Sequence, residues 1–305
     1  MHAHGLVKSF GDLVAVDAID FDVYPGEAFG FLGPNGAGKS STMRMIGCVS
    51  PPSDGTITVF GRDPVKDGAA IRARLGVVPQ EDTLDMELTV RENMLIYGRY
   101  FGLARKVVHE RAQRLLEFVQ LDERADSKVE PLSGGMKRRL TIARSLINEP
   151  EILLLDEPTT GLDPQARHLV WDRLHALKHA GATLLLTTHY MDEAEQLCDR
   201  LVVMDKGKIA AEGSPLELIR RYSTREVVEL RFASEHPPMD LARRIDGLAR
   251  RIETLSGRLL LYTDDGDGTA ERIHELGVNA QSTLVRRSTL EDVFLHLTGR
   301  TLVDE

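Results

Sequence analysis

This sequence of 305 residues predicts an α/β fold with a mainly parallel sheet, followed by a smaller α+β unit. Three observations support the prediction. Short apolar runs alternate with helical segments between residues 150 and 205, which is typical of βαβ units and right-handed crossovers. A glycine-rich loop joins an apolar run to a helix near residue 33. After about Ser223 the alternation gives way to short strands and helices in a different order.

The N-terminal part has the pattern of short strands separated by tight turns. Apolar residues recur at strand-like spacing over Val14–Val23, and a turn at Pro25-Gly26 precedes the apolar run Phe29–Leu32. Gly55–Gly61 is another β-rich segment. A helix from about Ile71 then leads to Leu75–Gln80, a buried strand that ends in a polar loop.

Residues 89–146 are predicted to form a helical insertion. Thr89 and Glu92 have the spacing of a capping box, in which each side chain hydrogen-bonds the other residue's backbone N–H. Arg105–Val119 carries apolar residues at helical spacing. Strand–helix alternation then resumes, with strands expected at Ile152–Leu155, Thr183–Thr187 and Leu201–Met204 and helices at Gln165–His179 and Met191–Cys198.

The C-terminal part predicts a βαββαβ unit of ferredoxin-like type. Its expected hairpin consists of Arg251–Leu255 and Arg258–Tyr262, which turn at Ser256-Gly257. The other expected elements are the strands Val227–Phe232 and Ser282–Arg286 and the helices Asp240–Ala249, Thr269–Leu276 and Leu290–Leu297.

The glycine-rich loop has the pattern G-x-x-x-x-G-K-[ST] between an apolar strand and a helix, the context in which this pattern binds phosphates. Backbone N–H groups of the loop and of the helix N-terminus favour an anion. Lys39 is expected to bridge the β- and γ-phosphates, and the Ser40 hydroxyl to ligate Mg²⁺. The sequence therefore predicts a nucleoside triphosphate site formed by Gly33, Pro34, Asn35, Gly36, Ala37, Gly38, Lys39, Ser40 and Ser41.

Two adjacent carboxylates follow the apolar run Ile152–Leu155. Acids at this position are expected at the carboxyl edge of a parallel sheet, where α/β folds bind ligands. Asp156 is predicted to hold Mg²⁺, directly or through water. Glu157, which faces a different direction, is predicted to orient and deprotonate the attacking water.

Ser133, Gly134 and Gly135 open a second helix whose N-terminus suits an anion. One nucleotide does not need two unrelated glycine loops. We therefore expect this element to meet the γ-phosphate of a nucleotide that another copy of the chain holds. The basic triplet Lys137–Arg139 that follows is interpreted as a solvated or partner-facing helix surface.

With these motifs in this order, the chain resembles the ATP-binding subunits of ABC transporters from about Leu6 to Tyr222. The resemblance implies a P-loop NTPase core with an antiparallel β subdomain and a helical insertion, a cofactor set of ATP and Mg²⁺, and the following assignments. Gln80 is the Q-loop residue that contacts Mg²⁺ and water, Asp163 lies in the D-loop, His189 is the switch histidine, and Phe10 stacks on adenine. The alternative for His189 is a histidine that merely caps a strand end. The alternative for Phe10 is an aromatic residue of the core. Leu132–Met136 matches the signature motif of the family, in which Met136 stands where glutamine is commoner.

Within this family, the chain resembles the ABC-2-type exporters, especially the nodulation-factor export and daunorubicin-resistance ATPases. The segments that carry this resemblance are Thr89–Asn93, Tyr97–Phe101 and Leu290–Arg300. This resemblance implies a homodimer that encloses two ATP molecules, a separate membrane permease, an amphiphilic substrate such as a lipo-oligosaccharide or drug, and a cytoplasmic location on the inner face of the membrane. A soluble ABC ATPase with a regulatory, ribosome-associated or DNA-associated role is the alternative. The domains are expected at 1–222 and 223–305.

Composition limits the other function classes. The net charge of −9 argues against a nucleic-acid-binding surface. The apolar runs have strand length, well short of the roughly 20 residues that a membrane span needs. The N-terminal residues do not have the pattern of a signal peptide. The two cysteines, Cys48 and Cys198, lack metal-ligand spacing, so we expect them to be buried core residues.

Overall fold

The computed structural model describes residues 1–233 and 241–299 of the chain. The chain divides into two compact units, Met1–Ser214 and a second unit that begins at Pro215. Within the described ranges, no helix has the length and apolar character needed to cross a membrane. The final residue of the segment Leu290–Arg300, whose sequence favours the exporters, lies outside the described residues.

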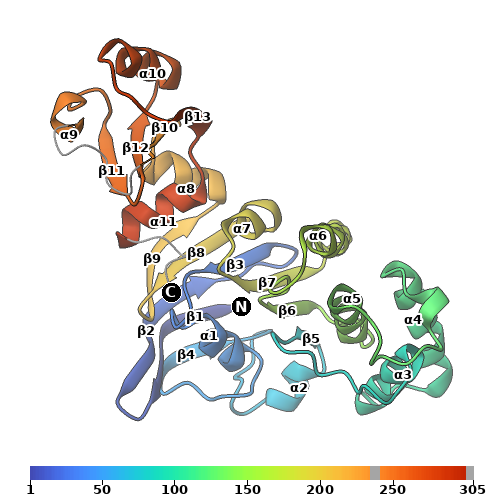
Figure 1. Cartoon of the computed structure of the whole chain (residues 1–305). Helices are drawn as coiled ribbons and strands as arrows, with labels where there is room; N and C mark the ends of the chain where they lie inside the picture. Colours follow the sequence, from blue (N-terminus) through green and yellow to red (C-terminus); the bar gives the residue numbers. More distant parts are fainter. Residues whose placement is uncertain (234–240, 300–305) are drawn as a thin grey trace. The chain divides into compact units, whose positions relative to one another are not determined.

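A six-stranded sheet in the order β5-β6-β7-β3-β8-β9 forms the centre of the first unit (Figure 1). All neighbouring strands are parallel except β8 and β9. The expected βα alternation is therefore confirmed, and β9 adds an antiparallel edge that the sequence did not predict. The strands are β3 (Ala28–Leu32), β5 (Leu75–Val78), β6 (Ile152–Asp156), β7 (Thr183–Thr188), β8 (Arg200–Asp205) and β9 (Lys208–Gly213).

The strand register places the functional edge of this sheet. Leu32 pairs with Thr188, and Asp156 pairs with Thr187, so β3, β6 and β7 end side by side. Four of the five residues of β6 are buried, and only the last, Asp156, is partly exposed. The buried leucines fix the strand in the core, and the acidic residues emerge where it ends.

An antiparallel sheet in the order β2-β1-β4 covers one face of the central sheet, together with helix α1 (Figure 1). Its strands are β1 (His2–Phe10), β2 (Leu13–Asp22) and β4 (Asp54–Thr58), and α1 spans Lys39–Ile46. Phe21, Phe29 and Phe31 pack ring against ring in this core, with ring centroids 5.1–6.1 Å apart. The antiparallel β subdomain expected from the resemblance is thus present.

The helical insertion has a hydrophobic core of its own, built from buried residues between Leu84 and Ile147. Its helices lie beyond the edge strand β5 (Figure 1). Thr89 and Glu92 form the expected capping box at the start of α3. The helices are α3 (Val90–Tyr100), α4 (Arg105–Phe118), η1 (Asp122–Arg124) and α5 (Gly134–Ser145). The remaining helices of the first unit are α2 (Gly68–Arg72), α6 (Pro164–His179) and α7 (Met191–Leu197).

The second unit contains a four-stranded antiparallel sheet in the order β11-β12-β10-β13. The expected βαββαβ sequence of elements is confirmed, and the hairpin turns where predicted. Its elements are β10 (Glu226–Arg231), α9 (Leu241–Arg244), β11 (Arg251–Leu255), β12 (Arg258–Thr263), α10 (Gly266–Glu275) and β13 (Ser282–Arg287), with α8 (Pro215–Tyr222) and α11 (Leu290–Thr298) packed against each other.

One predicted helix of the second unit is wrong in length. The sequence predicted Asp240–Ala249, whereas α9 covers only Leu241–Arg244 and Asp240 lies outside the described residues. Gly247 has a φ of +81°, in the left-handed region that ends helices. The chain therefore turns towards β11 instead of continuing the helix.

Candidate functional site

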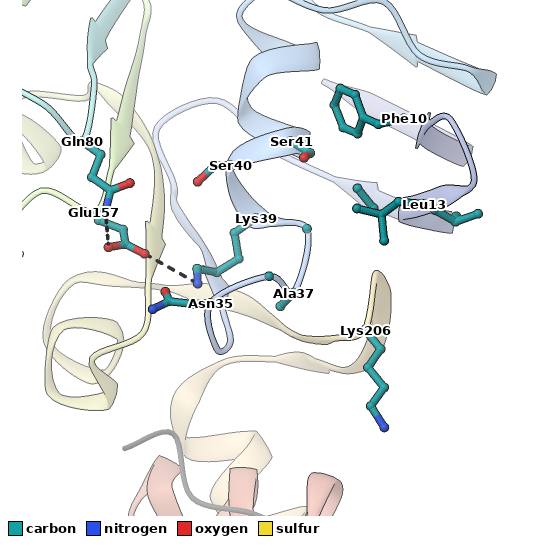
Figure 2. A pocket seen from close by; sticks show the side chains of 14 residues that line it. Phe10, Leu13, Asn35, Ala37, Lys39, Ser40, Ser41, Gln80, Glu157 and Lys206 are labelled. Atoms are coloured by element: carbon teal, nitrogen blue, oxygen red, sulfur yellow. Dashed lines mark hydrogen bonds and ion pairs between the residues drawn. The ribbon is translucent and has the colours of Figure 1, made fainter. Parts of the chain in front are cut away.

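A pocket of about 710 Å³ lies at the carboxyl edge of the central sheet, around the glycine-rich loop. Figure 2 shows Gln80 and Glu157 at one end of this pocket, Phe10 and Leu13 at the other, and Lys39 between them. The pocket thus has a charged end and an apolar end. Its lining is Phe10, Leu13, Val14, Ala15, Asn35, Gly36, Ala37, Gly38, Lys39, Ser40, Ser41, Gln80, Glu157 and Lys206.

The loop is tightly constrained at two of its glycines. Gly38 precedes helix α1 with a φ of +100°, and a Cβ there would lie 2.4 Å from the carbonyl oxygen of Ala15. A Cβ on Gly33 would lie 2.2 Å from the carbonyl oxygen of Met204. Both positions therefore require glycine, which lets the loop curl closely over the strand ends.

Lys39 is the first residue of α1 and is only 4% exposed. Its Nζ donates hydrogen bonds to the carbonyl oxygens of Gly33 (2.7 Å) and Pro34 (3.0 Å) and lies 3.7 Å from Glu157 Oε1. Burial lowers the pKa of the Lys39 ammonium, and the nearby carboxylates of Glu157 and Asp156 oppose this shift. The loop thus holds a desolvated cation in the place where the sequence predicted a phosphate contact.

Asp156 and Glu157 occupy different environments although they are adjacent. Asp156 Oδ1 accepts hydrogen bonds from Ser40 Oγ (3.1 Å) and from Thr187 Oγ1 (2.5 Å). A hydroxyl and a carboxylate oxygen are the hard oxygen ligands that Mg²⁺ prefers, and Mg²⁺ commonly uses only one or two protein carboxylates together with phosphate oxygens and water. Within the described ranges no cluster of three or more His, Cys, Asp or Glu side chains is placed to hold a metal ion. The side chains present fit the Mg²⁺–nucleotide type of site.

Glu157 is 5% exposed and lies among polar groups from four segments. Its Oε2 accepts hydrogen bonds from Gln80 Nε2 (3.2 Å) and Thr160 Oγ1 (3.1 Å), and its Oε1 lies 3.3 Å from His189 Nδ1. Burial tends to raise the pKa of this carboxyl, but the His189 imidazole and the Lys39 ammonium outweigh it, so the pKa lies below its ordinary value. Glu157 is therefore an ionised carboxylate near neutral pH, which is the form that accepts a proton.

The backbone at Glu157 is unusual, with a φ of +47°. A non-glycine residue in this region carries a cost of roughly 1–3 kcal/mol and persists only where its surroundings hold it there. The backbone N–H of Glu157 donates to Thr187 Oγ1 (3.0 Å) and to the Thr187 carbonyl oxygen (3.1 Å). Thr187, which the sequence argument did not single out, thus anchors both acidic residues.

The structure does not bring every predicted residue to this pocket. Ser133 caps α5 and accepts a hydrogen bond from the Met136 backbone N–H (3.3 Å), as the sequence predicted for a helix start. Asp163 caps α6 and accepts from Ala166 N (2.9 Å). Neither residue lines the pocket, and neither do Gly134 and Gly135.

Several residues were missed or misinterpreted from the sequence. No local motif marks four of the residues that line the pocket. They are Leu13, Val14 and Ala15 from the β1–β2 hairpin and Lys206 from the β8–β9 turn. The interpretation of Lys137–Arg139 as a solvated or partner-facing surface is wrong for Arg138, which is only 5% exposed. The guanidinium of Arg138 packs beneath the loop that carries Glu157 and hydrogen-bonds the Glu157 carbonyl (3.0 Å).

Comparison with known proteins places this site in a family. Residues 16–160 match the family model described as ABC transporter, and residues 239–299 match the model of the C-terminal domain of the nodulation factor export protein NodI. The Nod factor export ATP-binding protein I of Rhizobium sp. (strain N33) is 48% identical over 298 residues, covering 98% of this chain and 96% of the relative. The chain belongs to the ABC transporter family. The protein of the same name from Cupriavidus metallidurans (strain ATCC 43123 / DSM 2839 / NBRC 102507 / CH34) is also 48% identical, over 97% of this chain and 96% of its own length.

Solved structures of the family have the same fold. An ATP-binding subunit of an ABC transporter superposes with a TM-score of 0.66 and 30% identity, covering 72% of this chain and 92% of that one. A dimeric ATP-binding cassette in a post-hydrolysis state, bound to ADP and Pi, has a TM-score of 0.64 and 27% identity, covering 70% of this chain and 97% of its own. The predicted P-loop NTPase fold is therefore confirmed, and the chain is an ATP-binding ABC ATPase.

Proposed function

We propose that this ABC ATPase powers an ABC-2-type exporter, with a lipo-oligosaccharide or a similar amphiphile as the exported substrate. The observation that supports the substrate class best is the identity of 48% to proteins named for Nod factor export, which extends over nearly the full length of both chains. The match of residues 239–299 to the C-terminal domain of an export protein adds support outside the ATP-binding core.

We assign the site residues on the geometry of the pocket. Lys39 would contact the β- and γ-phosphates, and the loop backbone would hold the phosphates from Gly33 to Ser41. Ser40 and Asp156, with Gln80, would hold Mg²⁺, which supplies charge neutralisation at the phosphates. Glu157 would accept the proton of the attacking water, and His189 would stabilise charge that develops on the γ-phosphoryl group. Phe10, at the apolar end and 49% exposed, would stack on adenine.

We further propose a head-to-tail homodimer that encloses two ATP molecules. Ser133, Gly134, Gly135 and Asp163 do not line the chain's own pocket, and a Cβ on Gly134 would meet nothing within 4 Å. An open helix N-terminus of this kind suits a phosphate of the other copy's nucleotide. The dimeric cassette among the similar structures supports this arrangement.

The membrane partner is proposed to dock beside the helical insertion. A groove of about 510 Å³ lies there between β5 and α3, lined by Val77, Tyr97, Tyr100, Phe101 and Leu103 among others. Tyr100 is 79% exposed and Val77 is 40% exposed, an unusual state for large apolar side chains that face one groove. We propose that a membrane permease fills this groove, which would keep the ATPase on the inner face of the membrane. We also propose that the chain has a nucleotide-binding domain over 1–222, with its helical subdomain at 89–146, and an accessory domain over 223–305. We propose that it has no nucleic-acid partner.

Glu157→Gln tests the proposed mechanism. The amide keeps the shape of the side chain but cannot accept the water proton, so kcat should fall about 10²–10⁴-fold while ATP affinity is retained. With ATP and Mg²⁺ the variant should accumulate as a dimer in light-scattering measurements. Glu123→Gln, which alters an exposed carboxylate of the helical insertion, is the matched control and should behave like the wild type.

Two results would contradict the proposal. Normal turnover by Glu157→Gln would exclude Glu157 as the base, and unchanged ATP affinity in Lys39→Ala would exclude the phosphate contact. For the partner, the ATPase should enter the membrane fraction only when a membrane protein encoded beside it is also produced. Membrane association without that protein would argue against the proposed docking.

A further inference from the structure

Arg138 lies in the second turn of α5, five residues after the helix cap Ser133. Its guanidinium donates hydrogen bonds to five backbone carbonyl oxygens. The acceptors are Pro158 (2.6 Å, from Nε), Pro79 (2.5 Å) and Gln80 (3.5 Å) from one terminal nitrogen, and Asp156 (3.0 Å) and Glu157 (3.0 Å) from the other. A guanidinium has five N–H donors in a fixed plane, so this side chain is fully matched by its acceptors.

Burying the Arg138 guanidinium away from water costs folding free energy. Burial lowers the pKa of the Arg138 guanidinium, although the carboxylates of Asp82 and Glu193 oppose this shift. Among the described residues, no carboxylate oxygen lies within ion-pair distance of it. A well-packed apolar side chain could stabilise the fold as well as a buried arginine that is held only by carbonyl dipoles. Its geometric role is therefore of greater interest than its contribution to stability.

The five carbonyls belong to the two segments that carry the catalytic groups. Pro79 and Gln80 follow strand β5, and the other three acceptors follow or end strand β6. Glu157 has its unusual φ of +47° in the middle of the second segment, and its carbonyl oxygen accepts a hydrogen bond from the Thr160 backbone N–H (3.3 Å). Arg138 supplies a second donor to this carbonyl and ties both segments to α5.

We propose that Arg138 is a positioning residue that fixes the backbone of Gln80 and Glu157 relative to the N-terminus of helix α5. Through this connection, engagement of Ser133–Gly135 by a second copy would alter the placement of the chain's own Glu157. This inference rests on the proposed function for the roles of Glu157 and Ser133–Gly135. It adds a physical link between the two ATP sites of a dimer.

Arg144 on the same helix provides a matched control. It is 8% exposed, and it donates hydrogen bonds to the carbonyl oxygen (2.7 Å) and Oγ1 (2.5 Å) of Thr83, with its guanidinium 4.8 Å from the Tyr97 ring centroid. Neither Thr83 nor Tyr97 lines the nucleotide pocket. A substitution of Arg144 thus removes a buried guanidinium from α5 without freeing the carbonyls around Glu157.

The experiment compares Arg138→Met, Arg138→Lys and Arg144→Met in the full chain. ATP affinity is measured with a fluorescent ATP analogue, turnover by phosphate release, and folding by thermal melting. Arg138→Met should bind ATP within about 3-fold of the wild type but lose about 10- to 100-fold in kcat, because a displacement of about 1 Å at the reacting groups has that effect. Arg138→Lys, with three donors instead of five, should recover part of the kcat. Arg144→Met should melt earlier yet keep its kcat within about 3-fold.

Each outcome supports or overturns the inference. A wild-type kcat in folded Arg138→Met, or equal losses of kcat in the Arg138 and Arg144 variants, would overturn it. If Arg138→Met does not fold, the lysine variant decides, and an unchanged kcat in that variant would overturn the proposal. Failure of the proposed function has a different signature, namely normal turnover by Glu157→Gln, whereas failure of this inference leaves the effect of Glu157→Gln intact.

Discussion

Replacing Glu193 by glutamine should change how the stability of the first unit depends on pH. Glu193 lies on α7 and is fully buried. Its Oε1 accepts hydrogen bonds from Thr159 Oγ1 (2.8 Å) and Trp171 Nε1 (3.3 Å), whereas its Oε2 has no hydrogen-bond partner. Burial raises the pKa of this carboxyl above its ordinary value of 4.5. A glutamine side chain keeps an acceptor at Oε1 but carries no titrating proton.

The sign and size of the effect follow from proton linkage. Because the pKa is raised in the folded state, the folded protein keeps a proton that the unfolded chain releases above about pH 4.5. The stabilisation associated with that proton is fully present below the unfolded pKa and is lost as the pH rises through the folded pKa. The slope is about 1.4 kcal/mol per pH unit within this window. Relative to the wild type, Glu193→Gln should therefore gain about 1.4 kcal/mol of unfolding free energy for each pH unit of the window.

Urea unfolding at pH 5, 6, 7 and 8 provides the assay. Trp171 is the only tryptophan of the chain and contacts Glu193, so its fluorescence reports unfolding around the substituted side chain. Asp192→Asn, at the neighbouring exposed position, is the control and should differ from the wild type by less than about 0.5 kcal/mol at every pH. A difference between Glu193→Gln and the wild type that stays constant or shrinks as the pH rises would refute the reasoning.

Three further predictions concern the nucleotide, a helix cap and the thiols. Phe10→Ala should weaken ATP binding about 2- to 10-fold by loss of about 0.5–1.5 kcal/mol of stacking, as measured by titration, and Phe10→Tyr should retain the affinity. Thr89→Ala removes the capping box of α3 and should cost about 1 kcal/mol in urea unfolding without changing ATP affinity; an unchanged free energy would contradict the cap. Cys198 is buried with its pKa raised by burial, so a thiol reagent at pH 8 should modify at most one thiol per native chain and both in denaturant; rapid modification of two native thiols would contradict this burial.

Local signals explain the elements that could be predicted from the sequence. The glycine-rich loop, the Thr89 cap and the Ser256-Gly257 turn each depend on a few neighbouring residues, and each lies where the pattern indicated. The strand β6 could also be predicted, because an apolar run that ends in acidic residues is typical of a buried strand at the carboxyl edge of an α/β sheet. The βαββαβ order of the second unit also followed from periodicity, although α9 is shorter than predicted.

Burial by distant segments explains what could not be predicted. Arg138 belongs to a charged triplet that favours solvent, but its acceptors lie 20 and 59 residues away along the chain at Pro158 and Pro79. Leu13, at the start of β2, and Lys206, in the β8–β9 turn, reach the pocket from two different sheets, and only the tertiary fold brings them together. The roles of Ser133–Gly135 and Asp163 remain predictions, because each composite site of the proposed dimer needs residues from a second copy of the chain.

The separation of Ser133–Gly135 from the pocket of their own chain has a genetic consequence under the proposed dimer. A copy damaged at Lys39 still offers an intact helix N-terminus, and a copy damaged at Ser133 still offers an intact glycine-rich loop. When two such copies pair, both defects fall in one composite site and the other site is whole. Two alleles that are each inactive alone should therefore complement each other when they are produced in the same cell.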